Sequence, residues 1–107
     1  MATFLLLNGP NLNLLGRRET ELYGKISLEE IVNDLSNITK RVDHKLVSFQ
    51  SNAEHELVNR IHKASEEQVK CIVFNPGAFT HSSIALRDAL SGTATPFIEV
   101  HISNIYS

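Results

Sequence analysis

Short apolar runs alternate with amphipathic segments along the whole chain. Four runs, at 4–7, 46–49, 71–74 and 97–100, are typical of strands buried in a parallel sheet. Between them, apolar residues recur at helical spacing and predict three helices. Their inward positions are Leu28, Ile31, Val32, Leu35 and Ile38 in the first, Leu57, Val58, Ile61 and Ala64 in the second, and Ala85, Leu86, Ala89 and Leu90 in the third.

The ends of these helices carry recognisable signals. Ser27 with Glu30 predicts a capping box at the start of the first helix, and Ser51 with Glu54 predicts another at the second. The third helix is expected to begin at Thr80 or His81, after Asn75-Pro76-Gly77, and to stop at Gly92.

This alternation predicts βαβ units and a sheet covered on both faces. We therefore expect one α/β domain over residues 1–107, a flavodoxin-like doubly wound parallel sheet in three α/β/α layers. Its usual strand order, 2-1-3-4-5, places the first and third strands side by side at a switch point.

The sequence ends at Ser107, soon after the fourth strand. A sheet of this kind normally has a further strand and a covering helix, and the last strand here would be a bare apolar edge. Either an oligomer covers that edge or the native protein continues. We favour the second explanation, so the domain is expected to be C-terminally incomplete.

Composition narrows the class of protein. The chain has 107 residues, a net charge of −2 and no basic run, which argues against nucleic-acid binding. Its single cysteine, Cys71, excludes an internal disulfide and fits a reduced, cytoplasmic setting. The first apolar run is too short for a signal peptide or a membrane span.

Polar residues follow each predicted strand: Asn8 after the first, Gln50–Asn52 after the second, Asn75 after the third and His101–Asn104 after the fourth. The carboxyl ends of parallel strands face one crevice, where ligands bind. A single Asn in such a place is usually only a turn former. The coincidence across four strands favours a site.

Glu99 and His101 lie two residues apart on the fourth strand, so they share a face. A carboxylate in an apolar strand is costly unless it is paired. Glu99 could orient the ring of His101 for acid–base work. The alternative is a structural histidine with Glu99 bonded elsewhere.

The loop after the first strand contains Arg17, Arg18 and Tyr23, between Gly16 and Gly24. A tyrosine with its pKa lowered toward 7 would gain about 4 kcal/mol of preference for the phenolate. The two guanidinium groups are a possible source, and the glycines would let the segment act as a lid. Equally, the arginines are solvated and Tyr23 only anchors the loop.

Two further features concern the third helix. Its N-terminal turn, residues 75–83, offers amides and hydroxyls to an anion. Asp88 could accept a hydrogen bond from a substrate hydroxyl, or be an ordinary surface charge. No P-loop, dinucleotide fingerprint, flavin phosphate loop or paired metal-ligand spacing occurs in the sequence.

Taken together, these residues resemble type II 3-dehydroquinate dehydratases over almost the whole chain. The matching stretches are Asn8–Arg18 with Tyr23 and Gly24, Phe49–Asn52, Asn75–Ala78 through to His81, Ala85–Ala89 and Pro96–Asn104. The resemblance implies a flavodoxin-like enzyme without metal or other cofactor. It eliminates water from 3-dehydroquinate in the anti sense through an enolate, giving 3-dehydroshikimate in the shikimate or quinate pathway.

The resemblance also implies roles for individual residues. Tyr23 would be the base, Arg18 would stabilise its phenolate, and Asn11 would help hold a water against the enolate oxygen. His101 would be the general acid, oriented by Glu99. The substrate would be held by the side chains of Asn75, His81 and Asp88 and by the backbone amides of Ile102 and Ser103.

The family is typically a homo-oligomer, a dodecamer built from trimers, and its members continue past Ser107 with a substrate-contacting arginine, a fifth strand and closing helices. Two other classes remain as alternatives: a non-catalytic ligand-binding or assembly module, and a flavin-binding electron-transfer domain, which the missing phosphate loop disfavours. Neither nucleic acid nor membrane is an expected partner.

Overall fold

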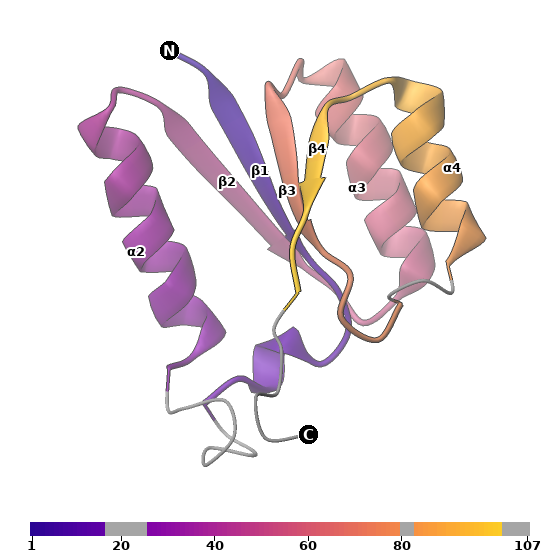
Figure 1. Cartoon of the computed structure of the whole chain (residues 1–107), viewed down its shortest axis with the longest axis horizontal. Helices are drawn as coiled ribbons and strands as arrows, with labels where there is room; N and C mark the ends of the chain where they lie inside the picture. The colour runs from indigo at the N-terminus through magenta and orange to yellow at the C-terminus, as the bar shows by residue number, and fades with distance from the viewer. Residues whose placement is uncertain (17–25, 80–82, 102–107) are drawn as a thin grey trace.

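The computed structural model describes residues 1–16, 26–79 and 83–101 (Figure 1). In this part of the chain, strands alternate with α-helices in the order β1 Thr3–Asn8, α2 Leu28–Arg41, β2 Lys45–Gln50, α3 Glu54–Glu66, β3 Cys71–Asn75, α4 Ile84–Thr93 and β4 Phe97–Glu99. Two short 3-10 helices, η1 Leu12–Leu14 and η2 Gly77–Phe79, follow β1 and β3. The sequence pattern did not predict these two.

The four strands form one parallel sheet in the order β2-β1-β3-β4. This confirms the expected flavodoxin-like order as far as β4, with β1 and β3 adjacent. All four strands run toward the lower end of Figure 1, so their carboxyl ends lie at the same edge of the sheet.

The core lies between the sheet and the pair α3 and α4. Alternate residues of β1 and β3 point to this side, because side chains alternate between the faces of a strand. They are buried against one face of each helix. The members are Leu5, Leu7, Ile72 and Phe74 from the strands, Leu57, Ile61 and Ala64 from α3, Leu86, Ala89 and Leu90 from α4, and Val69.

Helix α2 lies beside β2, away from α3 and α4 (Figure 1). Its predicted apolar face is only half-buried, none of its residues is buried, and the side chain of Ile38 is 52% exposed. The two sides of the sheet therefore differ. One holds a closed core, and the other is covered mainly over β2.

The N-terminal ends of α2 and α4 are each capped by a serine. The hydroxyl of Ser27 accepts from the amide of Glu30 at 3.1 Å, as the first capping box predicted. The hydroxyl of Ser83 accepts from the amide of Leu86 at the same distance. The predicted start of this helix at Thr80 or His81 is therefore wrong, because Ser83 is the N-cap.

Three other predicted details are corrected. Ser51 does not cap α3, because its hydroxyl accepts from the amide of Ala53 and bonds the carboxylate of Glu56, and the helix begins at Glu54. Gly92 does not stop α4. The helix runs to Thr93, and Ala94 takes the left-handed conformation with φ of 54°. Ala85 is exposed rather than inward.

Among the described residues, no helix has both the length and the apolar character that a bilayer crossing requires.

Candidate active site

Three amide side chains line up where β2, β1 and β3 end. Asn8 stands opposite Gln50 on one side and Asn75 on the other. Asn8 and Asn75 are buried. The expected gathering of polar residues at the carboxyl ends is therefore confirmed for these three strands.

The loop that leaves β1 is held from both sides. The amide of Gly9 donates to the carbonyl of Asn75 at 2.8 Å. The side chain of Gln50 donates to the carbonyl of Gly9 at 3.1 Å and to the Oδ1 of Asn52 at 3.2 Å. That same Oδ1 accepts a hydrogen bond from the backbone amide of Asn11 at 3.0 Å. The end of β2 thus fixes the backbone of Asn11.

Asn11 itself is exposed and has a left-handed backbone, with φ of 67°. Asparagine tolerates this conformation better than most residues do. Its backbone amide is used by Asn52, and the residue is exposed, so its side chain is accessible to a ligand. Sequence reasoning gave Gln50 and Asn52 no role beyond polarity, although Gln50 ends β2 and Asn52 lies two residues beyond it.

Asn75 partly shows the turn-forming behaviour that a single Asn usually has. Its Oδ1 accepts from the amide of Gly77 at 3.2 Å. The side-chain oxygen is therefore used within the turn, and the side-chain amide is the group that Asn75 could offer a ligand.

Glu99 and His101 are paired, as their spacing predicted. The Oε2 of Glu99 lies 3.0 Å from the Nε2 of His101. Glu99 stands opposite Phe74, one residue before Asn75, so the pair lies at the same sheet edge as the amides. Both side chains are partly exposed, at 24% for Glu99 and 37% for His101. A hydrogen-bonded carboxylate can fix the tautomer and orientation of an imidazole.

The other predicted site residues are less well placed or cannot be placed. Asp88 is exposed on α4, and no hydrogen bond or ion pair within the described part of the chain joins it to the rest of the site. Five predicted residues lie outside the described residues: Arg18, Tyr23, His81, Ile102 and Ser103.

In the ranges 1–16, 26–79 and 83–101, no three His, Cys, Asp or Glu side chains gather so as to hold a metal ion.

Comparison with known proteins places this arrangement in a family. The sequence model described as "Dehydroquinase class II" matches residues 2–107. The 3-dehydroquinate dehydratase of Thioalkalivibrio sulfidiphilus is 62% identical over 107 residues, which is 100% of this chain and 73% of that protein. The protein of the same name from Proteus mirabilis is 60% identical over 103 residues, covering 96% of this chain and 69% of that one.

Solved structures agree. The type II dehydroquinase from Butyrivibrio crossotus superposes with a TM-score of 0.92 at 41% identity, over 99% of this chain and 74% of that one. The type II dehydroquinase from Propionibacterium acnes superposes with a TM-score of 0.89 at 37% identity, over 98% of this chain and 72% of that one. With the same sheet and nearly the whole sequence matched, this chain belongs to the class II dehydroquinase family.

Proposed function

We propose that this chain is a hydro-lyase that converts 3-dehydroquinate to 3-dehydroshikimate in the shikimate pathway. The observation that carries the proposal is the Glu99–His101 pair, 3.0 Å apart at the carboxyl end of the sheet, in a chain of the class II dehydroquinase family. An imidazole held by a carboxylate at that edge is suited to acid–base chemistry on a bound ligand.

In the proposed reaction, the phenolate of Tyr23 removes a proton from the carbon next to the ketone, and the electrons move onto the ketone oxygen as an enolate. Arg18 stabilises the phenolate. The enolate electrons then expel the hydroxyl from the next carbon, and a proton from His101 converts it to water. The products are one water and a conjugated enone, so atoms and charge balance.

Asn11 is suited to the enolate in this scheme. We propose that its side chain helps to hold a water against the developing negative charge, where a fixed donor stabilises the transition state. The hydrogen bond from its amide to Asn52, at 3.0 Å, supports this role because it fixes the backbone from which the side chain extends.

The remaining candidates are proposed to bind the substrate. Asn75, His81 and Asp88 would contact ring hydroxyls, and the amides of Ile102 and Ser103 would contact the carboxylate. The exposed position of Asp88 on α4 leaves it accessible to a ligand or to a second copy of the chain. We also propose that the enzyme works without a metal or other cofactor and that it assembles into a dodecamer built from trimers.

The test is an ultraviolet assay for the conjugated enone, run on the full-length protein with 3-dehydroquinate as substrate. We expect Tyr23→Phe and His101→Ala each to reduce turnover by at least about 100-fold, since general acid–base groups typically contribute 10²–10⁴. Tyr106→Phe and His62→Ala serve as matched controls. They alter the only other tyrosine and an exposed histidine of α3, and both should keep nearly normal rates.

Near-normal turnover in either Tyr23→Phe or His101→Ala would overturn the role assigned to that residue. A wild-type protein that binds 3-dehydroquinate without turnover would favour the non-catalytic ligand-binding module instead.

A further inference from the structure

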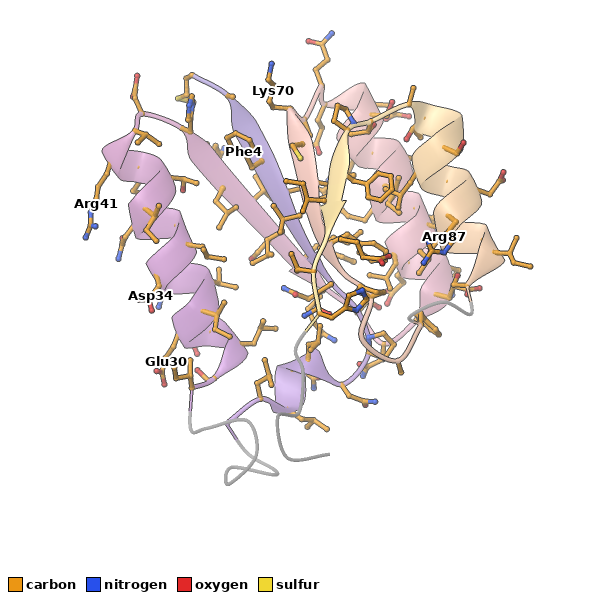
Figure 2. The ribbon with its side chains drawn as sticks, viewed as in Figure 1. Phe4, Glu30, Asp34, Arg41, Lys70 and Arg87 are labelled. Carbon is orange, nitrogen blue, oxygen red and sulfur yellow. The ribbon has the colours of Figure 1, made fainter. Side chains whose placement is uncertain are left out.

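A guanidinium group joins the Glu99–His101 pair. Arg87 lies on α4, four residues after the N-cap Ser83, and extends toward the sheet (Figure 2). Its Nη2 lies 3.5 Å from the Oε1 of Glu99. Helix α4 and strand β4 therefore meet at this carboxylate.

Each oxygen of Glu99 has its own partner. Oε1 faces Arg87, and Oε2 lies 3.0 Å from the Nε2 of His101. The terminal torsion of a glutamate is broad, so a carboxylate held at one oxygen only can rotate. A guanidinium on the other oxygen limits that rotation and keeps Oε2 directed at the imidazole.

The burial of the three groups decreases outward from the carboxylate. Glu99 is 24% exposed, whereas Arg87 is 51% exposed. A pair between two fully exposed side chains usually contributes little. Here the carboxylate is mostly withdrawn from water, so its orientation depends more on its protein partners.

We propose that Arg87 is a positioning residue, which holds the Glu99 carboxylate so that Glu99 in turn orients His101. This inference rests on the proposed function, in which His101 is the general acid. Arg87 needs no contact with the substrate in this role. Its effect should therefore appear in kcat and not in KM.

The first experiment compares Arg87→Ala, Arg87→Lys and the control Arg41→Ala in the enone assay. Arg41 is the exposed last residue of α2, on the opposite side of the molecule (Figure 2). We expect Arg87→Ala to lower kcat about three- to fivefold, as for a partly exposed ion pair, with KM changed less than about twofold. Arg87→Lys should recover part of the loss, and Arg41→Ala should behave as wild type.

The second experiment tests whether Arg87 acts through Glu99. In a Glu99→Gln background, Arg87→Ala should cause no further loss of kcat, because residues of one network are not additive. An equal loss in both backgrounds, or a loss confined to KM, would overturn the proposal. A wild-type protein without turnover would instead count against the proposed function.

A measurement that needs no turnover tests the positioning role of Arg87 separately from the proposed enzymatic function. The nitrogen-15 NMR signals of the His101 ring, assigned by their absence in His101→Ala, should shift in Arg87→Ala and stay in place in Arg41→Ala. In the Glu99→Gln background, Arg87→Ala should leave them unchanged. His101 signals that do not respond to Arg87→Ala in the wild-type background would refute the positioning role, whatever the enzyme assay shows.

Discussion

At position 9 a glycine is required because there is no room for a side chain, and not because of its backbone conformation. A Cβ at this position would lie 2.2 Å from the carbonyl oxygen of Pro76, which belongs to the turn after β3. The backbones of the two loops touch here, next to the hydrogen bond from the Gly9 amide to Asn75. The glycine thereby sets the distance between the loop that carries Asn11 and the turn that follows Asn75.

We expect Gly9→Ala to destabilise the protein by about 1–3 kcal/mol or more, because the clash is with backbone, which cannot rotate away. Gly92→Ala is the matched control. A Cβ there meets nothing within 4 Å, and the residue lies in α4. This control should be neutral or stabilising by up to about 1 kcal/mol.

Urea unfolding of the two variants measures both free energies. Equal stabilities of Gly9→Ala and wild type would mean that the loops after β1 and β3 can separate without cost. The sequence pattern predicted only that Gly9 lies just after the first strand, which was expected at 4–7. It could not predict the contact with Pro76, because the two residues meet only through the pairing of β1 with β3.

At the site, the two-residue spacing of Glu99 and His101 was the reliable signal. Although β4 ends at Glu99, the amide of Val100 still donates to the carbonyl of Phe74, and the carboxylate and the imidazole meet as alternation along a strand predicts. The bonds of Asn52 to Asn11 and of Arg87 to Glu99 could not be predicted in this way. Each joins residues from different elements, and only the sheet register and the helix packing bring them together.

Among the elements, the four strands were predicted to within one residue at every boundary, because apolar runs end sharply at polar residues. The helix starts were harder. Ser51 and Ser83 are both serines ahead of an apolar pattern, yet only Ser83 caps. The hydroxyl of Ser51 is used by Ala53 and Glu56 instead, a competition between local hydrogen bonds that the pattern does not reveal.

Helices α2 and α3 have similar sequence patterns but different surroundings. Leu57, Ile61 and Ala64 of α3 are fully buried, whereas α2 has no buried residue. Amides should therefore exchange faster in α2, because a segment with few buried contacts opens at lower free energy. We expect at least about tenfold faster hydrogen exchange over 28–41 than over 54–66, equivalent to about 1.4 kcal/mol.

Mass spectrometry of peptides from the two helices measures this difference. Equal protection would mean that another surface covers α2 in solution, and a second copy of the chain is the first candidate to examine.

At the scale of the whole molecule, apolar side chains remain exposed at the outer edge of the sheet. In the described part of the chain, β4 pairs only with β3. Phe97 is 43% exposed, Ile98 58% and Val100 38%. An open apolar edge strand is a site where other polypeptide segments readily pair, so this side of the protein has a physical reason to be covered.

The proposed dodecamer offers one way to cover it. We expect sedimentation velocity at micromolar concentration to give a main species with a mass about twelve times that of one chain, since self-association would remove exposed apolar surface from water. Dilution should release trimers before monomers if the assembly is built from trimers. A single monomeric species at these concentrations would contradict the proposed assembly. It would also mean that the edge residues Phe97, Ile98 and Val100 stay in water. The free-energy cost of that exposure would then have to be offset by the burial of this small core alone.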